Sequence, residues 1–516
     1  MKKTPLFDIH MASAARIVNL KGFARPVEYV GHTEEHRAIR ERVSLCDVSH
    51  MGELEFTGRD ALTLVDRLIT NDAARLDVNQ ALYTVMCNEN GHVIDDLVCL
   101  RLAEDRFIWV VNVTKTDEDY RWVLKHAEGL DVHVRNLSTD LALIALQGPY
   151  SSEVLQKITE ADLSEMAYYR LAEASVMTRE LEVRCIVSRI GYTGERGYEI
   201  CVSRDLAPCV WEALIRAGRP LGIVPHGVAA RESARTEAGY LLNGNDMDDR
   251  TYPYEVGLGW VVKLYKDFIG RDALAAIAEQ GTPRKLVGLE ADGCRTIRHG
   301  YPIFKDGERI GQVTSGPLSP DLLGGASSLG LGFVASPHAQ DGNVIQVGVR
   351  DAHYDAGIIA YPFRERRVRD GARVNTLSPY GLRYSEDHLW VGTEPGGRAT
   401  IGLTDFAQRD LGEMLFVELP TPGNRIVRGS PFGWLDAYRK PFDLIAPLSG
   451  TVVAVNTSVV DRPSDANRYP YARDGLIQIE PSDTGEISEL VHMAAYTEIT
   501  RKLERYEAWS QDLRLT

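Results

Sequence analysis

Cysteine is scarce in this chain, and the few cysteines present follow no pairing pattern. The 516 residues include seven cysteines, an odd number, with no Cys-x-x-Cys pair and none in the last third of the sequence. A secreted disulfide framework needs an even set of cysteines, and a zinc ribbon needs them in close pairs. We therefore exclude both classes of protein and expect a reducing, cytoplasmic location.

Long hydrophobic runs are also absent. No stretch of about 18 apolar residues occurs, and a membrane-spanning helix needs at least that length. Near the N-terminus, Pro5, Asp8 and His10 interrupt the apolar stretch that a signal peptide would require. We expect no association with a membrane.

Positive charge is in short supply. Lysine and arginine together number 58, against 73 aspartates and glutamates, for a formal net charge of −15. A bulk electrostatic attraction to nucleic acid or to an anionic membrane surface requires a surplus of cations. Neither is an expected partner of this chain.

Motifs of the common nucleotide-binding and hydrolase classes are missing. No Gly-Lys dipeptide occurs, which excludes a Walker A loop, and no G-x-S-x-G elbow is present. The pairs Gly257/Gly259 and Gly330/Gly332 have no third glycine to complete a dinucleotide fingerprint. The sequence thus gives no support to an NTPase, a dinucleotide-dependent enzyme or an α/β-hydrolase.

The segment His32–His36 (HTEEH) fits the H-x-x-E-H zinc pattern, in which two histidines four residues apart share a helix face. The alternative is a charged, solvated helix start, because the sequence that follows is polar over most of its surface. No third ligand at a metal-binding spacing is evident. We favour the helix start and predict no metal site.

Composition divides the chain into segments of different character. Residues 364–373 (RERRVRDGAR) are charged and nearly free of large apolar residues, which is typical of a surface linker. Before this segment, strand-like runs alternate with amphipathic helical stretches. After it, short strand patterns recur about every ten residues, which favours a small barrel or sandwich. With a weaker break at 281–284, we predict domains at 1–275, 276–366 and 376–516, and a linker at 367–375.

A β-hairpin is predicted around Asn90-Gly91, a strong turn signal between two apolar runs. Asp95 and Asp96 begin the returning strand, where a period of two directs successive side chains to opposite faces. A carboxylate that points inward needs a partner or a function, because its desolvation is costly. A pair of turn-capping aspartates is the alternative, with equal support from the local sequence.

Two further segments carry residues suited to binding. Residues 191–199 (GYTGERGYE) interleave glycines with two tyrosines, which suits either a tight hairpin close to a flat ligand or a hairpin with simple tyrosine packing. Arg231 and Arg235 would share a helix face, where they could bind a carboxylate or form structural ion pairs.

Taken in order, these motifs resemble the aminomethyltransferase (T-protein) family of the glycine cleavage system, over residues 1 to 370. The segments that carry the resemblance are Lys3–Phe7 (KTPLF), Asp47–Glu53 (DVSHMGE), Ile69–Asp72 (ITND), Asn88–Leu97 (NENGHVIDDL), Gln147–Pro149 (QGP), Gly191–Glu195 (GYTGE), Asn245–Met247 (NDM), Glu255–Lys263 (EVGLGWVVK) and Thr314–Gly316 (TSG). The resemblance implies an α+β, three-domain cloverleaf aminomethyltransferase fold around a central site for tetrahydrofolate.

The resemblance also implies roles for individual residues. Asp96 matches the catalytic carboxylate, which would hold the folate and stabilise positive charge at the transferred carbon. Glu199 would bind the donor edge of the pterin, and Arg231 would pair with a carboxylate. The matching cofactor-binding positions are Met51, Tyr83, Asp96, Asn112, Tyr192, Glu199, Arg231 and Arg364.

The last part of the chain, about 376 to 500, resembles the glycine cleavage H-protein, the lipoyl carrier. The segments that carry this resemblance are His388–Val391 (HLWV), Gly402–Gln408 (GLTDFAQ), Leu411–Pro420 (LGEMLFVELP), Pro447–Asn456 (PLSGTVVAVN) and Tyr469–Tyr471 (YPY). The resemblance implies a β-rich barrel-sandwich hybrid, similar to a lipoyl domain, fused to the transferase.

The lipoyl attachment site departs from the family pattern. An ungapped match places Arg439 where the family has the lysine that carries lipoate. A guanidinium stays protonated and is not acylated in that chemistry. Lys440 is adjacent, but one step along a strand reverses the direction of the side chain, and Pro441 stiffens the tip. We do not expect lipoate as a cofactor.

These observations favour a tetrahydrofolate-dependent one-carbon transferase that passes a methylene or methyl unit to tetrahydrofolate. The expected partners are a small-molecule one-carbon donor and a separate lipoylated H-protein. Two alternatives stay open: a folate-dependent demethylase of a small N-, O- or S-methyl compound with a non-lipoylated H-like domain, and a non-catalytic folate-binding regulator.

Overall fold

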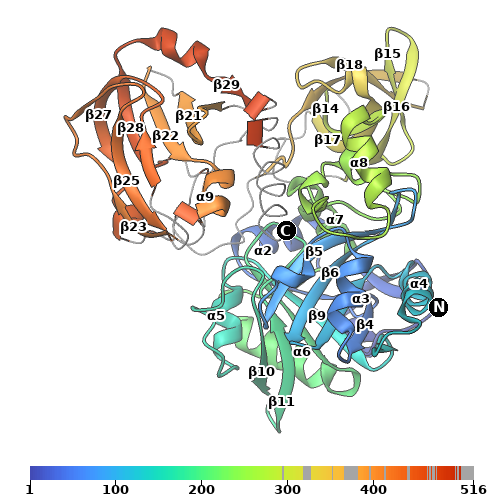
Figure 1. Cartoon of the computed structure of the whole chain (residues 1–516). Helices are drawn as coiled ribbons and strands as arrows, with labels where there is room; N and C mark the ends of the chain where they lie inside the picture. Colours follow the sequence, from blue (N-terminus) through green and yellow to red (C-terminus); the bar gives the residue numbers. More distant parts are fainter. Residues whose placement is uncertain are drawn as a thin grey trace. The chain divides into compact units, whose positions relative to one another are not determined.

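The chain divides into two compact units, Met1–Asp370 and Gly371–Thr516 (Figure 1). The computed structural model describes residues 1–292, 296–317, 327–350, 352–364, 382–393, 397–411, 414–437, 442–461, 463, 466–467, 471, 474–493, 495–496 and 499–500. Within these residues, no helix has the length and hydropathy that crossing a bilayer requires. The predicted linker at 367–375 lies outside the described residues.

A five-stranded antiparallel sheet occupies the first part of unit 1. Its strands, in spatial order, are β5 (Gln80–Cys87), β6 (Val93–Ala103), β7 (Arg106–Val111), β4 (Gly52–Thr57) and β8 (His133–Asn136). The turn between β5 and β6 forms as predicted: Asn88 Oδ1 accepts from the backbone N–H of Asn90 and His92, and Gly91 has a φ of +79°. The apolar face of the five-stranded sheet packs against α3 (Ala61–Leu68) and α4 (Thr116–Ala127).

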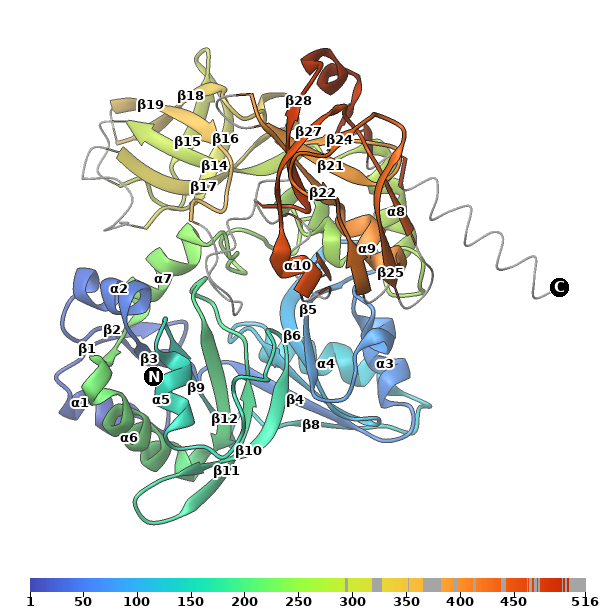
Figure 2. The same cartoon turned by 90° about the vertical axis from the view of Figure 1, so that its left-hand side faces the viewer.

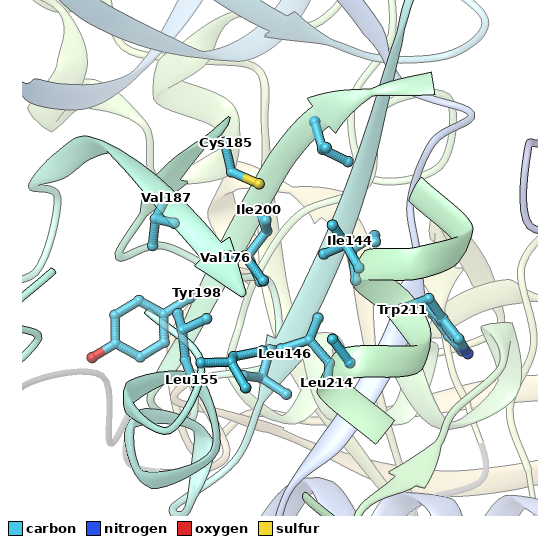
Figure 3. Packing of buried hydrophobic residues seen from close by; sticks show 14 of the residues in the cluster. Ile144, Leu146, Leu155, Val176, Cys185, Val187, Tyr198, Ile200, Trp211 and Leu214 are labelled. Carbon is cyan, nitrogen blue, oxygen red and sulfur yellow. The ribbon is translucent and has the colours of Figure 1, made fainter. Parts of the chain in front are cut away.

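A six-stranded sheet is the second layer of unit 1. Its strands, in spatial order, are β10 (Leu171–Met177), β11 (Glu182–Ser188), β12 (Gly197–Ser203), β9 (Leu141–Gln147), β3 (Ser44–Asp47) and β13 (Val224–Pro225). The amphipathic helices α5 (Ser151–Gln156) and α6 (Ala207–Gly218) cover one face of this sheet. Figure 3 shows this core, in which Leu146 of β9 and Leu214 of α6 are buried together.

The two sheets face each other through a shared apolar core. Leu100 and Val110 of the five-stranded sheet are buried in one cluster with Cys46, Ala145 and Cys201 of the six-stranded sheet. Strand alternation explains the pattern, because each strand presents one side to its helices and the other side to the opposite sheet. Polar side chains on the inward-facing side therefore end up between the sheets.

A smaller layer covers one end of the six-stranded sheet. It contains α1 (Phe7–Ala12), the two-stranded sheet of β1 (Arg16–Leu20) and β2 (Phe23–Glu28), α2 (His32–Glu41) and α7 (Val228–Glu237), several of which Figure 2 shows together. Helix α7 packs against both α2 and β2. At Gly227, directly before α7, a Cβ atom would lie 2.2 Å from the carbonyl oxygen of Val27, so only glycine permits this close approach.

Unit 1 ends in a closed β-barrel. Its strands are β14 (Arg284–Asp292), β17 (Ser327–Ala335), β16 (Glu308–Ser315), β15 (Pro302–Lys305), β18 (Val344–Val349) and β19 (Ala352–Ile359), preceded by α8 (Arg271–Gln280). The barrel begins directly after the composition break at 281–284. Its interior is filled by branched apolar side chains such as Leu289, Ile303 and Val347.

Unit 2 is β-rich, as the spacing of its short strand patterns predicts. One sheet contains β24 (Arg425–Ile426), β27 (Gly450–Val455), β28 (Ile477–Pro481), β22 (Ala399–Leu403), β21 (Leu389–Thr393), β20 (Arg383–Tyr384) and β29 (Val491–His492). The other contains β23 (Met414–Glu418), β25 (Pro431–Ala437) and β26 (Phe442–Ile445). Both sheets share one apolar core with α9 (Asp405–Leu411) and α10 (Thr457–Asp461).

Short 3₁₀ helices connect several of these elements. They are η1 (Ala73–Arg75), η2 (Arg204–Leu206), η3 (Arg219–Leu221), η4 (Pro253–Val256), η5 (Gly259–Val261), η6 (Ser336–His338) and η8 (Thr484–Glu489).

Truncation of Leu146 to alanine is expected to lower the free energy of unfolding by about 2–5 kcal/mol, because it leaves a cavity in a fully buried cluster. Urea denaturation followed by circular dichroism measures the change. Leu124→Ala is the matched control, since Leu124 is 42% exposed and its loss should cost no more than about 0.5 kcal/mol. Equal effects of the two substitutions would contradict the packing described.

Candidate active site

The carboxylate of Asp96 is held by two donors. Asp96 lies on β6 opposite Val85 of β5 and is half-buried. The hydroxyl of Tyr83 donates to its Oδ2 at 2.9 Å, and Nδ2 of Asn112 donates to its Oδ1 at 2.9 Å. Burial raises the pKa of Asp96 to about 6, while these two hydrogen bonds favour the anion and oppose that rise. The carboxylate is therefore the main form at neutral pH.

Asp95 is buried directly behind Asp96 and binds the same asparagine. Its two oxygens accept from Nδ2 of Asn112 at 2.8 Å and from the backbone N–H of Asn112 at 2.9 Å. Strand alternation directs Asp95 and Asp96 apart, but Asn112 directly follows the neighbouring strand β7 and reaches both side chains. The amide of Asn112 thus has its NH₂ group fixed toward the two aspartates.

A third acid, Asp119 of α4, is buried against Asp95. Burial, followed by the charge of Asp95, raises the pKa of Asp119 far above its ordinary value. Burial and Asp96 raise the pKa of Asp95 to a smaller extent. Two buried carboxyl groups close together do not both ionise, so Asp119, whose pKa is raised more than that of Asp95, keeps its proton. No sequence motif pointed to Asp119, which lies in a charged first helical turn.

Aromatic rings surround Asp96. The ring of Tyr83 stacks on Trp260 with centroids 6.0 Å apart and an interplanar angle of 25°. The ring of Tyr192 stacks on Tyr240 at 5.6 Å and 21°, and the Arg231 guanidinium lies 5.5 Å from the Tyr192 ring centroid. The charge of Asp96 contributes to raising the pKa of both Tyr83 and Tyr192. The structure therefore brings both predicted tyrosines to the predicted aspartate.

Two glutamates approach each other across the two sheets. Glu199 of β12 is half-buried, and burial raises its pKa to about 7, with Arg231 opposing the rise. Glu53 of β4 is 1% exposed, and neither of its side-chain oxygens has a hydrogen-bond partner among the described residues. Burial, and then the charge of Glu199, raise the pKa of Glu53 to about 8. Glu53 was not among the predicted site residues, although its motif (DVSHMGE) supported the resemblance.

Met51 and Arg364 occupy other surroundings. Met51 packs against the core between the two sheets. The backbone N–H of Arg364 donates to the carbonyl of Glu237, and its guanidinium lies 3.9 Å from Glu195. Both glutamates form ion pairs with the buried Arg40, at 3.0 Å from Glu195 and 2.7 Å from Glu237. Among the described residues, no hydrogen bond or ion pair joins Arg364 to Asp96.

The histidines of the zinc-like motif bind a serine. Nε2 of His32 and Nδ1 of His36 lie 2.9 Å and 2.7 Å from Oγ of Ser233. Glu35 points to backbone amides and accepts from Val30 at 2.9 Å and Gly227 at 2.8 Å. No group of three or more metal-binding side chains occurs among the described residues. Arg439 and Lys440 lie outside the described residues.

Three family models match the chain in sequence order. The GCVT N-terminal domain matches residues 6–266, the glycine cleavage T-protein C-terminal barrel domain matches 284–364, and the glycine cleavage H-protein matches 382–503.

Individual proteins match the first 370 residues. An aminomethyltransferase of Halothermothrix orenii is 43% identical over 364 residues, which is 70% of this chain and all of that protein. An aminomethyltransferase of Thermotoga maritima is 46% identical over 322 residues, 62% of this chain and 87% of that protein. The crystal structure of the glycine cleavage system aminomethyltransferase T from Bartonella henselae has a TM-score of 0.66 at 30% identity, covering 72% of this chain and 99% of that one.

Glu53→Gln should change how stability depends on pH. The folded-state pKa of Glu53, about 8, exceeds its ordinary value of 4.5, so the wild type loses stability as pH rises between these two values. Relative to that of wild type, the free energy of unfolding of the variant should rise by about 3 kcal/mol between pH 5 and pH 8. Urea unfolding at the two pH values measures the gain, with Glu153→Gln as an exposed control. A constant difference between variant and wild type would show that Glu53 is ionised in the folded protein.

Proposed function

Because the chain belongs to the aminomethyltransferase family, we propose that it transfers a one-carbon unit to tetrahydrofolate beside Asp96. The observation that carries the proposal is the carboxylate of Asp96, oriented by Tyr83 and Asn112 within a half-buried aromatic site. A fixed anion in a site of low dielectric stabilises positive charge that develops on a nearby carbon or nitrogen.

The side chains around Asp96 fit tetrahydrofolate chemically. The rings of Tyr83 and Tyr192 offer flat apolar surface for a pterin. Arg231 is the cation that acts on Glu199, and the Glu199 carboxylate can accept hydrogen bonds from the N–H edge of the pterin. Nε of Arg231 is buried without a hydrogen-bond partner among the described residues and can donate to a carboxylate. Bound tetrahydrofolate supplies the nitrogen nucleophiles that accept the one-carbon unit.

In the proposed site, one residue supplies negative charge and its neighbours fix the orientation of that residue. Asp96 supplies the negative charge, and the two donors on its oxygens prevent its side chain from turning away. Asp95 accepts from the NH₂ group of Asn112, which keeps that group directed toward Asp96, and Asp119 stays protonated beside Asp95. Preorganised groups of this kind need no rearrangement when charge develops, which is why they lower the barrier.

The source of the one-carbon unit depends on whether the H-like unit carries lipoate. We propose that this unit carries no lipoate, because Arg439 aligns with the family's acceptor lysine. The one-carbon unit would then arrive on a separate lipoylated H-protein or on a free small molecule. Methyl-tetrahydrofolate formed from a free methyl donor, or methylene-tetrahydrofolate formed from a free donor that already carries a methylene unit, without added H-protein, would select the second route.

Asp96→Asn should separate binding from catalysis. The amide keeps the shape and most contacts but removes the charge, so affinity for tetrahydrofolate should stay within about tenfold while turnover falls by about 100-fold or more. Fluorescence titration and a folate-product assay measure the two quantities. Asp105→Asn, at an exposed position in the turn after β6, is the matched control.

The two other outcomes of this experiment are informative. A parallel loss of binding and turnover would assign Asp96 a structural role. Unchanged turnover would support the non-catalytic folate-binding alternative.

Intact-mass measurement of the protein, expressed in a lipoylating host, should show the unmodified chain. Arg439→Lys should acquire the mass of one lipoyl group, because it restores the acceptor at the aligned position. Lys440→Arg is the control, and its measured mass should be that of the chain without a lipoyl group. A lipoyl group on the wild type that disappears in Lys440→Arg would overturn this part of the proposal.

A further inference from the structure

A fully buried acid joins the barrel of unit 1 to the segment that follows α7. Oδ1 of Asp246 accepts from the hydroxyls of Thr314 at 2.6 Å and Ser315 at 2.7 Å, where β16 ends. Oδ2 accepts from the guanidinium of Arg235 at 2.6 Å and from the backbone N–H of Leu242 at 2.9 Å. One oxygen of this carboxylate therefore binds the barrel, and the other binds α7 and the segment after it.

Arg235 of α7 is the second buried member of this network. Its Nη2 donates to Oγ of Ser315 at 2.8 Å, and its Nη1 donates to the carbonyl oxygen of Tyr240 at 3.1 Å. It also forms an ion pair with Glu232 at 2.8 Å. Of the two uses that the sequence left open for this arginine, the structure shows structural ion pairing.

Three successive residues after α7 are each held by a hydrogen bond. The carbonyl of Tyr240 accepts from Arg235, and the N–H of Leu242 donates to the buried carboxylate. Between them, the carbonyl of Leu241 accepts from the hydroxyl of Tyr192. The rings of Tyr192 and Tyr240, which we call the tyrosine pair, stack with centroids 5.6 Å apart at 21°. The bonds that fix this backbone therefore also fix the tyrosine pair.

The physical character of the network suits it to hold a geometry. Its central ion pair and both barrel hydroxyls are buried, so water does not compete for their hydrogen bonds. Hydrogen bonds between charged partners are short and strongly directional. Ser315 lies 80 residues after Arg235 in the sequence, so the network also joins distant segments. A buried polar network with satisfied members makes its surroundings rigid.

We propose that Asp246 is a positioning residue that holds the tyrosine pair in the orientation that binds the pterin. It acts through Arg235 and through the backbone of residues 240–242, and the two barrel hydroxyls anchor it. The inference rests on the proposed function, because it assigns the tyrosine pair to tetrahydrofolate. The barrel hydroxyls thereby contribute to folate affinity from outside the tyrosine pair.

Fluorescence titration of the full chain with tetrahydrofolate tests the effect on binding. Asp246→Asn keeps the size of the side chain but removes its charge, so the guanidinium and the backbone after α7 lose their anchor. The Kd for tetrahydrofolate should rise by at least about tenfold. Glu55→Gln is the matched control, because Glu55 is also buried and forms ion pairs with Arg106 at 3.0 Å and Arg135 at 2.8 Å on β4 and its neighbours. Its Kd should stay within about twofold of wild type.

Hydrogen exchange of the same proteins without ligand tests the positioning directly. The N–H of Leu242 donates to the carboxylate that Asp246→Asn alters. Peptides that cover residues 240–246 should therefore exchange at least about tenfold faster in Asp246→Asn than in wild type. Glu55→Gln should leave the exchange of these peptides unchanged.

A milder pair of variants keeps the test decisive if Asp246→Asn does not fold. Thr314→Val has the same shape as wild type but lacks the hydroxyl that donates to Asp246, and it should raise the Kd for tetrahydrofolate by about threefold or more. Thr314→Ser keeps the hydroxyl and should restore the wild-type affinity. General destabilisation would not produce this rescue.

The remaining outcomes separate the two proposals. Wild-type affinity in Asp246→Asn and Thr314→Val overturns the inference, and so does a Thr314→Ser variant as weak as Thr314→Val. A wild type that does not bind tetrahydrofolate contradicts the proposed function. In that case, faster exchange at 240–246 in Thr314→Val but not in Thr314→Ser still supports the positioning of the tyrosine pair, and unchanged exchange in both overturns it.

Discussion

One side-chain amide organises the centre of this protein. Asn112 donates to Asp95 and to Asp96 from the same nitrogen, and its backbone N–H donates to Asp95 as well. These bonds hold two adjacent carboxyl groups, which strand alternation would otherwise separate, in one network. They depend in turn on the pairing of β6 with β7, which places the end of β7 beside the start of β6. The orientation of the proposed catalytic carboxylate thus follows from sheet register.

Burial of acids is the second recurring feature of unit 1. Asp95, Asp119, Glu53 and Glu199 are all removed from water to different extents, and burial raises the pKa of each. Such groups weaken the fold at neutral and alkaline pH, because the unfolded chain releases their protons more readily. Perturbed acids of this kind cluster at functional sites, where a charge or a proton must be held ready.

The fusion adds a β-rich unit whose family carries a cofactor on lysine, at a position where this chain has Arg439. Under the proposal above this unit carries no lipoate, since an arginine does not form that amide. The Asp96 network is retained although the proposed unit carries no lipoate. This combination favours a donor that reaches the site independently of the H-like unit.

Local patterns in the sequence determined the β5–β6 hairpin and the strands of unit 2, because turn chemistry and strand periodicity act between neighbouring residues. Only the family resemblance singled out Asp96 from Asp95. The resemblance identified Tyr83, Asn112 and Tyr192, which the structure brings to Asp96. Only the tertiary structure revealed Glu53 near Glu199 and Asp119 near Asp95. The members of these pairs come from distant segments, and their proximity depends on how sheets and helices pack. Packing surfaces are set by many weak contacts, so no short motif records which charged side chains they enclose.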